Sequence, residues 1–222
     1  MHVVVTSPAT ARDVVSMGVA PEDITVVAPG SDRVVTPSRS TNNAGVQLLC
    51  VATLTPRKGH AVLLQALAGL QHHRWVLHIV GSTERDPGTS ARLRAQAAPL
   101  GERVVWHGEL PGTALHAHYA AADVFVLPSL YEGYGMVVAE AIAHGLPVVT
   151  TDGGALADTL PPAAGLQVPA GDAPALQAAL DRVLSDPALR AHLADGARQA
   201  AAALPTWAQQ AARFAAVLEN LP

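Results

Sequence analysis

Short runs of β-branched and aliphatic residues alternate along the chain with longer Ala- and Leu-rich stretches. The short runs predict eight strands, at residues 3–6, 24–28, 47–52, 75–80, 103–107, 123–127, 147–150 and 165–168. These runs are apolar on both faces, which is typical of buried parallel strands. Helical patterns lie between them, at about 9–18, 59–71, 89–99, 112–121, 136–144, 153–160 and 172–185. The repeated strand-then-helix order predicts an α/β fold with a doubly wound, Rossmann-like parallel sheet and right-handed crossovers.

Two segments break this alternation. Residues 29–45 are rich in Pro, Ser, Asn and Gly and show no periodicity, so we interpret them as a linker. The β-α-β segment before it, residues 1–28, is too short to form a core of its own. Two Ala-rich helices, 186–203 and 207–219, follow the last predicted strand and helix. We therefore expect one complete domain, 46–203, with an incomplete N-terminal β-α-β fragment before it and the segment 204–222 after it.

Composition narrows the classes of protein that fit this chain. Half of the 222 residues are apolar and 14% are charged, which argues against extended disorder. Lys and Arg number 14 against 18 Asp and Glu, and the net charge of −4 argues against a nucleic-acid-binding protein. No apolar run reaches the roughly 18–20 residues that span a bilayer. We expect a cytoplasmic, soluble protein, and peripheral contact with the inner face of the membrane stays open.

Two features of the sequence bear on the cell compartment, namely the first ten residues and the number of cysteines. Residues 1–10 (MHVVVTSPAT) have no basic region and too short an apolar stretch for a signal peptide. The single Cys50 excludes a disulfide framework and fits a reducing compartment. Both observations favour the cytoplasm.

A pair of cations marks the first candidate ligand loop. In an open α/β sheet, ligands bind at the carboxyl ends of the strands, in the loops that open the next helices. Arg57 and Lys58 lie in such a loop, after the strand at 47–52. Cations at the start of a helix oppose the helix dipole, so the pair indicates an anionic ligand bound there with the backbone N–H groups. A solvated turn is the simpler explanation of an isolated Arg-Lys pair, and it stays open.

The second candidate loop, residues 128–135 (PSLYEGYG), leads into the helix at 136–144. Its glycines let the backbone approach a ligand closely. Glu140 lies in that helix among apolar neighbours, so its carboxylate needs a hydrogen-bond donor. Two sugar or ribose hydroxyls would satisfy it, and a surface position on a narrow polar stripe is the alternative. A third loop, 151–154 (TDGG), fits a ligand site and a plain strand-to-helix connection equally well.

The ordered set of motifs between residues 49 and 168 is more specific than any single loop. It comprises Lys58-Gly59, Val80-Gly81, Gly108 with Tyr119, ADVFVLPS at 122–129, EGYG at 132–135, Glu140-Ala141 and GLPVV at 145–149. This set resembles the donor domain of retaining glycosyltransferases with the GT-B fold, of the family 4 or group 1 type. Residues 1–30 resemble the last β-α-β of that family's acceptor domain.

The resemblance implies a role for each candidate. Lys58 and Arg57 would hold the donor's diphosphate and neutralise the charge that develops as the nucleotide leaves. Glu132 would hydrogen-bond hydroxyls of the transferred sugar, and these three are the catalytic candidates. Glu140 would bind the ribose. The other donor-binding candidates are backbone groups at Gly133, Tyr134 and Gly135 near the sugar and diphosphate, at Gly108 to Leu110 near the base, and at Gly81.

Three departures from the family's pattern concern donor contacts. Ala52-Thr53 stand where Gly-Arg is frequent, and Arg57 is the residue that would substitute for that arginine. A glycine-rich turn after Val80-Gly81 is replaced by STERDP at 82–87. Asp158 stands where a glutamate is common.

The family resemblance implies no bound metal and no cofactor, with a UDP- or GDP-sugar as donor substrate. The ten histidines are scattered along the sequence rather than grouped. His116 and His118 lie two apart on a predicted helix, so they face different ways and make a poor chelate.

A GT-B enzyme needs two Rossmann-like domains, with catalysis in the cleft between them. The resemblance therefore implies that 1–28 is a remnant of the acceptor domain, 29–45 a linker, 46–203 the nucleotide-sugar-binding domain and 204–222 a C-terminal crossover helix. The acceptor domain, with the family's usual catalytic histidine, would lie upstream of Met1. The expected function is sugar transfer with retention of anomeric configuration, with this chain supplying the donor-binding half.

Two alternatives stay open. The chain fits a non-catalytic partner subunit, or an inactive truncated domain that binds nucleotide sugar, because the 1–28 fragment and the last helix lack an evident partner. An epimerase or phosphorylase on the same scaffold fits the spacing of Glu132 and Glu140 less well. The acceptor (glycan, lipid-linked or small molecule) and a second polypeptide that carries the acceptor domain are left undetermined.

Overall fold

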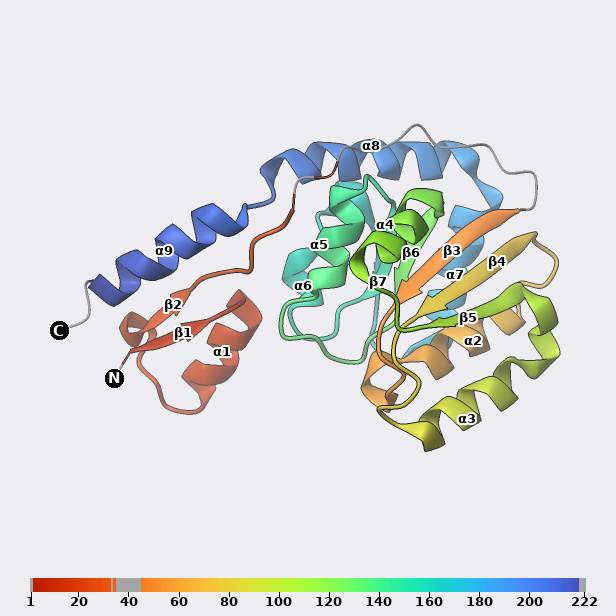
Figure 1. Cartoon of the computed structure of the whole chain (residues 1–222), viewed down its shortest axis with the longest axis horizontal. Helices are drawn as coiled ribbons and strands as arrows, with labels where there is room; N and C mark the ends of the chain where they lie inside the picture. Colours follow the sequence, from red (N-terminus) through yellow and green to blue (C-terminus); the bar gives the residue numbers. More distant parts are fainter. Residues whose placement is uncertain (1, 33, 35–44, 220–222) are drawn as a thin grey trace.

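A six-stranded parallel sheet with helices on both faces forms the main body of the chain (Figure 1). The structure is a computed structural model that describes residues 2–32, 34 and 45–219. The strands of this sheet are β3 (Val46–Val51), β4 (Trp75–Val80), β5 (Val104–Gly108), β6 (Val124–Leu127), β7 (Val148–Thr151) and β8 (Gly165–Val168). Every pairing between them is parallel. The predicted doubly wound α/β fold is confirmed.

The strand order defines where a ligand site is expected. The sheet runs β5-β4-β3-β6-β7-β8, so the chain winds outward from β3 in one direction and from β6 in the other. β3 and β6 are paired neighbours, with Leu48 opposite Val124 and Leu49 opposite Phe125. Adjacent strands whose connections leave in opposite directions open a crevice at their carboxyl ends, where α/β proteins bind ligands. The loops after β3 and β6 flank this switch point.

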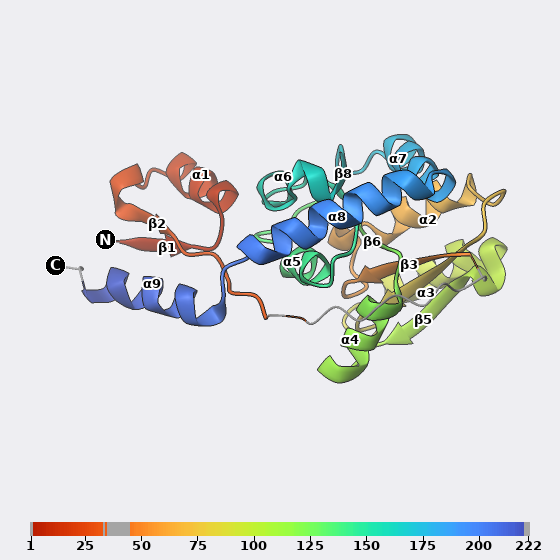
Figure 2. The same cartoon turned by 90° about the horizontal axis from the view of Figure 1, so that it is seen from above.

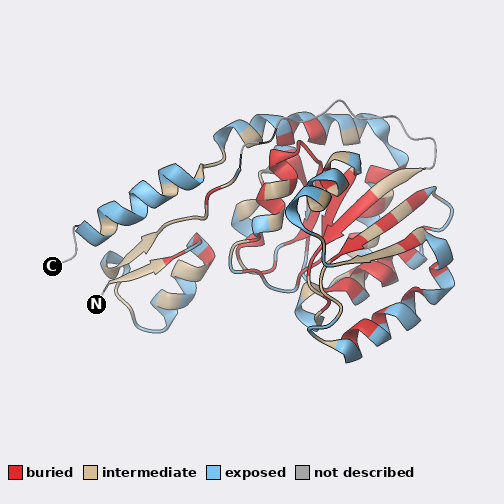
Figure 3. Cartoon of the chain, viewed as in Figure 1, coloured by how far each residue is buried: buried red, intermediate tan, exposed pale blue. Residues whose placement is uncertain are grey.

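Side chains of β3, β4, β6 and β7 contribute to two apolar cores, one on each face of the sheet, and the edge strands β5 and β8 contribute to one of them. Leu48 and Cys50 of β3 belong to one core, and Leu49 and Val51 belong to the other. Figure 3 shows that much of the sheet is buried between its covering helices. Burial raises the pKa of the Cys50 thiol to about 12. The first core is covered by α2 (His60–Ala68), α3 (Pro87–Ala97) and α7 (Ala173–Ser185), and the second by α4 (Gly112–Ala121), α5 (Met136–Ala143) and α6 (Leu156–Thr159); α8 (Pro187–Ala203) contributes to both.

The N-terminal segment forms a separate two-stranded parallel sheet, as the incomplete β-α-β prediction requires. It comprises β1 (Val3–Val5), α1 (Pro8–Ser16) and β2 (Ile24–Val26). Ser7 caps α1 by accepting a 3.1 Å hydrogen bond from the N–H of Thr10, and Pro8 supplies a φ suited to the first helical turn. In Figures 1 and 2 this segment lies at the same end of the molecule as α9 (Trp207–Glu219).

Four polar contacts join the N-terminal segment to loops of the large sheet. Arg12 forms a 2.8 Å ion pair with Asp158, and the hydroxyl of Tyr131 donates to Asp13 at 2.7 Å. The hydroxyls of two threonines, at 6 and 10, donate to the carbonyl of Gly133 at 3.4 and 3.3 Å. Three of these contacts hold the N-terminal segment against the loop after β6, and the ion pair with Asp158 holds it against α6.

The segment near residue 30, which follows the N-terminal sheet, contacts the segment near residue 205, which precedes α9. The N–H of Ser31 donates a 2.8 Å hydrogen bond to the carbonyl of Pro205. A Cβ added to Gly30 would lie 2.3 Å from the backbone of Trp207, so this close approach requires glycine. α9 then extends outward, and none of its residues, all of which are described, is buried. Its exposed apolar side chains include Trp207, Phe214 and Leu218.

The structure shortens some predicted elements. The helix expected at 153–160 is only Leu156–Thr159, because Gly153 and Gly154 lie in the turn before it. Short 3-10 helices, which the pattern did not predict, occur at Pro21–Asp23, Pro56–Lys58, Ala98–Arg103 and Pro162–Ala164, each with proline in its first turn. The linker prediction at 29–45 falls mostly outside the described residues. Among the helices of the described residues, none is both long and apolar enough to cross a bilayer.

Candidate functional site

The loop after β3 is held against the loop after β6 by a glycine that no other residue can replace without strain. Pro56–Lys58 forms one 3-10 turn, and Gly59 ends it with φ +68°. A Cβ at Gly59 would lie 1.9 Å from the carbonyl oxygen of Pro128, closer than any van der Waals contact. The N–H of Leu130 also donates to the carbonyl of Arg57 at 2.8 Å. This packing brings the Arg57-Lys58 pair to the β6 loop.

An ion-pair cluster forms where these two loops meet. Lys58 Nζ lies 2.5 Å from Oε1 of Glu132, and an Arg57 guanidinium nitrogen lies 3.4 Å from Oε2. Ser129 donates its hydroxyl to Oε1 at 2.7 Å. Glu132 is 7% exposed, and these partners offset the cost of burying its carboxylate. Two cations face one carboxylate, and the surplus positive charge suits an anionic ligand. The three catalytic candidates are therefore in contact.

The third loop, residues 151–154, and the residue after it form hydrogen bonds with the backbone of Glu132. The N–H of Glu132 donates to the carbonyl of Gly153 at 3.2 Å, and the carbonyl of Glu132 accepts from Ala155 at 2.8 Å. A Cβ at Gly154 would lie 2.4 Å from the oxygen of Glu132. Thr151 donates its hydroxyl to the carbonyl of Ser129. The TDGG loop thus acts as a backbone support for the carboxylate.

Glu140 lies at a pocket between α4 and α5. The pocket has a volume of about 220 Å³, and its walls include Tyr119, Tyr134 and Glu140. The phenol of Tyr119 donates to Oε2 of Glu140 at 2.8 Å. Burial, together with the charge of Glu140, raises the pKa of Tyr119 well above its usual value, so the phenol stays a donor. A protein hydroxyl thus satisfies one oxygen of the carboxylate that the sequence predicts to need a donor.

His144 also lines this pocket, although the sequence patterns do not predict a role for it. Its ring stacks on Tyr119 with centroids 4.7 Å apart, and its Nδ1 lies 2.8 Å from the backbone oxygen of Glu140. Its Nε2 lies 3.1 Å from Nδ1 of His116. Burial lowers the pKa of His144. The spacing of one helical turn between Glu140 and His144 is the signal that could have identified it.

The remaining donor-binding candidates occupy two positions. The N–H of Gly81 donates to the carbonyl of Gly108 at 2.8 Å, so these two turns meet at the ends of β4 and β5. Gly133 and Gly135 lie on the segment that connects Glu132 to α5, and Gly135 begins that helix with φ +86°. Leu110 packs at the edge of the second core.

The candidates fall into three groups rather than one. Lys58, Arg57 and Glu132 lie together, Glu140 and Tyr134 line the pocket, and Gly81 meets Gly108 at the ends of β4 and β5. Among the described residues that form the walls of that pocket, Lys58 and Glu132 do not occur. The segment 132–135 joins the first group to the second.

His60 is a second histidine that sequence reasoning did not select. It is 1% exposed at the start of α2, and among the described residues neither of its ring nitrogens has a hydrogen-bond partner. Burial, with the adjacent charge of Lys58, lowers its pKa to about 4. The ring is therefore neutral at physiological pH and contributes no charge to the site.

Comparison with known proteins agrees with the motif order. The family model of glycosyl transferases group 1 matches residues 36–200. The chain is similar to an MMP alpha-(1->4)-mannosyltransferase of Mycolicibacterium hassiacum, with 33% identity over 219 residues that cover 96% of this chain and 53% of the relative. It is also similar to a GDP-mannose-dependent alpha-(1-6)-phosphatidylinositol monomannoside mannosyltransferase of Mycolicibacterium smegmatis, with 34% identity over 185 residues, 78% of this chain and 47% of the relative.

The fold has solved counterparts as well. The structure of Anabaena HepE in complex with UDP and glucose aligns with a TM-score of 0.88 and 21% identity, over 99% of this chain and 63% of that chain. The chain thus spans about half the length of the curated relatives it matches. Because the family model covers residues 36–200 of the 222, the chain belongs to the group 1 glycosyltransferases.

Proposed function

We propose that this chain is the nucleotide-sugar-binding half of a retaining glycosyltransferase of the family 4 type. It binds a UDP- or GDP-linked hexose, which is transferred to an acceptor with retention of anomeric configuration. The cluster of Lys58, Arg57 and Glu132 at the switch point between β3 and β6 is the observation that carries this proposal.

In this proposal the cationic pair binds the donor's diphosphate. Without a donor, Glu132 neutralises Lys58 at 2.5 Å. A diphosphate brings competing oxygens to Lys58 and Arg57, and Glu132 then accepts hydrogen bonds from the hydroxyls of the sugar. Lys58 and Arg57 stabilise the negative charge that grows on the diphosphate as the glycosidic bond breaks. This charge stabilisation by side chains needs no divalent metal.

The pocket at α5 binds the nucleoside. One oxygen of Glu140 accepts the phenol of Tyr119, which leaves the other to accept a ribose hydroxyl. The apolar wall formed by Tyr134 and its neighbours covers the sugar ring. The connecting segment 132–135 places its N–H groups between the nucleoside and the transferred sugar, where the diphosphate lies.

Two findings on relatives support the donor class. A relative is named as GDP-mannose-dependent, and the HepE structure holds UDP and glucose. Both ligands are nucleoside diphosphates or their sugar conjugates. GDP-mannose and UDP-glucose are therefore the first donors to test.

The acceptor site belongs to a second Rossmann-like unit. The chain covers 53% and 47% of two full-length relatives, which leaves room in such proteins for that unit. The exposed apolar face of α9, with Trp207, Phe214 and Leu218, is the surface on which we place it. A non-catalytic partner subunit uses the same face. Native mass measurement separates the two, since a defined complex with a non-transferase partner favours the subunit.

Calorimetric titration of the full chain with GDP, UDP, GDP-mannose and UDP-glucose tests the donor proposal, with AMP as a control that lacks the diphosphate. We expect micromolar-to-millimolar binding of at least one nucleoside diphosphate. Lys58 is the only lysine in the sequence, so protein labelled with [15N]lysine gives one backbone signal from the site. That signal should shift with the binding nucleotide and not with AMP. No heat and no shift with any of the four ligands would refute the proposal.

A further inference from the structure

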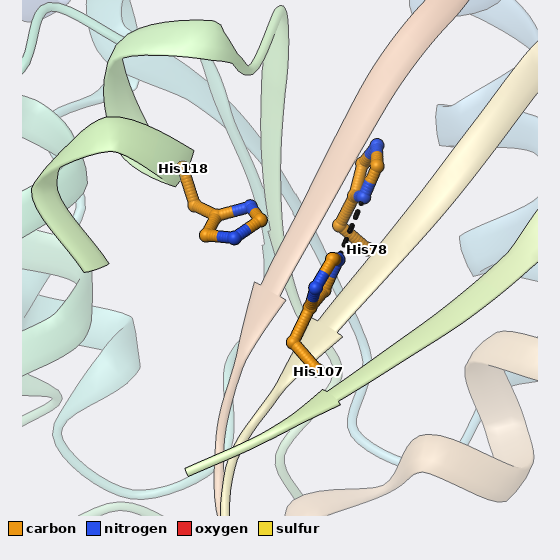
Figure 4. Close-up of side chains that lie close together, drawn as sticks. All are labelled: His78, His107 and His118. Atoms are coloured by element: carbon orange, nitrogen blue, oxygen red, sulfur yellow. Dashed lines mark hydrogen bonds between the residues drawn. The ribbon is translucent and has the colours of Figure 1, made fainter. Parts of the chain in front are cut away.

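Three histidines that are distant in sequence converge on one face of the sheet (Figure 4). His78 lies on β4, His107 on β5 and His118 on α4. Each offers a ring nitrogen, and these three nitrogens all lie within 4.8 Å of one another. The histidines are scattered along the sequence, but the fold groups these three in space. His116 and His118 do face different ways, and His118 finds its partners on the sheet rather than on its own helix.

The rings are held at short range by the fold. His107 and His118 have centroids 4.2 Å apart, and His78 lies 5.2 Å from the first and 5.9 Å from the second. Nδ1 of His78 lies 2.9 Å from Nε2 of His107. All three side chains are half-buried. The parallel pairing of β4 with β5 places His78 beside His107, and α4, which packs against β3, brings His118 to them.

A second layer of hydrogen bonds sets the tautomer of His78. Gln47 donates its Nε2 to the carbonyl of Gly45 at 2.9 Å, so its Oε1 faces His78. Nε2 of His78 lies 3.0 Å from that oxygen and therefore carries the proton. Nδ1 of His78 then holds a lone pair that points at His107. An imidazole whose outer N–H is bound to a carbonyl, with its inner nitrogen free to donate a lone pair, is the arrangement that protein metal ligands adopt.

We propose that His78, His107 and His118 form a binding site for a divalent transition metal, with Zn²⁺ as the preferred ion. Three imidazole ligands suit four-coordinate Zn²⁺, which takes nitrogen ligands from histidine, and ligands of this kind do not favour Mg²⁺ or Ca²⁺. A tetrahedral ion with Zn–N bonds of 2.0–2.1 Å separates two ligand nitrogens by about 3.3 Å. The 2.9 Å between His78 and His107 needs to open by only a few tenths of an ångström. His107 moves its proton from Nε2 to Nδ1, so no net proton is released by that ring.

The ion would tie α4 to the sheet. α4 carries Tyr119 on its inner side, and Tyr119 contacts Glu140 in the pocket. His107 directly precedes Gly108, whose carbonyl accepts from Gly81. A metal bridge between α4 and β5 therefore stiffens the frame of the pocket. It lies outside the group formed by Lys58 and Glu132, and the proposed sugar transfer does not pass through it.

A second group of possible ligands serves as the internal comparison. His72, His73 and Asp181 also bring ligand atoms within 4.8 Å. The carboxylate there already pairs with His73 at 2.7 Å, and the side chains of His72 and Asp181 are 64% and 49% exposed. Competition from water weakens such a site, so we assign the tighter binding to the half-buried histidines.

Titration of the full chain with Zn²⁺, after treatment with EDTA and removal of the chelator, tests the proposal. We expect one tight Zn²⁺ per chain, and Co²⁺ in its place should give the visible absorption bands of a four- or five-coordinate ion. His107→Gln and His118→Gln should each abolish the tight site. His73→Ala, in the other group, and His192→Gln, on an exposed face of α8, should leave it unchanged. Circular dichroism shows that each variant is folded.

Two variants of Gln47 keep the test decisive even where a histidine variant does not fold. Gln47→Leu removes the support of His78 without removing a ligand, and it should weaken Zn²⁺ binding about ten- to a hundredfold. Gln47→Glu keeps an acceptor at that position and should retain or tighten the binding. The proposal is overturned if the parent chain binds no Zn²⁺ in the micromolar range, if tight binding survives in the His107→Gln and His118→Gln variants, or if both Gln47 variants bind like the parent.

Discussion

The ammonium of Lys58 lies 2.5 Å from the carboxylate of Glu132, although 74 positions separate the two residues in sequence. The contact exists because β3 and β6 are neighbours in the sheet and each residue lies in the loop that leaves its strand. The pair is nearly buried, with 17% and 9% of the two side chains exposed. Removing one partner therefore affects both the site and the stability of the fold.

Replacing Lys58 with alanine should weaken nucleoside diphosphate binding by about 1–3 kcal/mol, because one charged hydrogen bond is lost. Isothermal titration with the tightest nucleotide measures this. Arg92→Ala, on the distant helix α3, is the matched control and should bind like the parent. Equal affinities of the Lys58→Ala variant and the parent would contradict the assignment of the diphosphate to this loop.

Glu140→Ala should weaken nucleotide binding by about 1–3 kcal/mol, since it removes the proposed acceptor of a ribose hydroxyl. Tyr119→Phe leaves the carboxylate in place and removes only its internal donor, so its effect should be smaller. The exposed Glu102 supplies a control, because Glu102→Ala changes net charge equally. Comparing the ribonucleotide with its 2′-deoxy form sharpens the test. If the ratio of their affinities is the same in the parent and in Glu140→Ala, Glu140 does not bind that hydroxyl.

Gly59→Ala should destabilise the fold by at least about 1–3 kcal/mol, because a side chain there adopts φ +68° and meets the carbonyl of Pro128. Urea denaturation measures the loss. Gly112→Ala is the control, since an added Cβ at the start of α4 meets no atom within 4 Å. Its stability should match or slightly exceed that of the parent. Equal stability of the two variants would show that the two loops do not pack as described.

His60 makes stability depend on pH. Its pKa is about 4 in the fold and near 6.5 in the unfolded chain, so the unfolded state binds more protons between these values. The free energy of unfolding is therefore unaffected by His60 above pH 6.5 and falls as pH drops toward 4. At pH 5 the loss from this residue is about 2 kcal/mol. Urea denaturation at pH 7.5 and pH 5 should show a smaller decrease for His60→Gln than for the parent. The same decrease in both proteins would contradict the burial of a neutral ring.

Most of the fold was predictable from sequence because its signals are local. All eight predicted strands occur, since buried parallel strands need uninterrupted apolar runs and the helices between them do not. The 3-10 helix at Pro56–Lys58 was not predicted, because its conformation depends on Gly59 packing against Pro128. Whether a segment forms a helix or a strand follows from its local sequence. The conformation of a turn such as Pro56–Lys58 depends on residues that are distant in sequence.

The candidate site was predictable only in part, for the same reason. The motif order predicts that Lys58, Glu132 and Glu140 serve one donor site, but it contains no information on strand order. The structure adds that Glu132 pairs with Lys58 while Glu140 pairs with Tyr119. The cluster around His78 has no signature in sequence, because its members come from two paired strands and a covering helix.

The hydrogen bond between Ser31 and Pro205 joins the segment that follows β2 to the segment that precedes α9. A side chain at Gly30 would collide with the backbone of Trp207, so the two segments leave no space between them. A substitution at Gly30 would therefore displace the start of α9 as well as the N-terminal segment, whose threonines donate to the carbonyl of Gly133. A single glycine thus constrains the placement of both ends of the described chain.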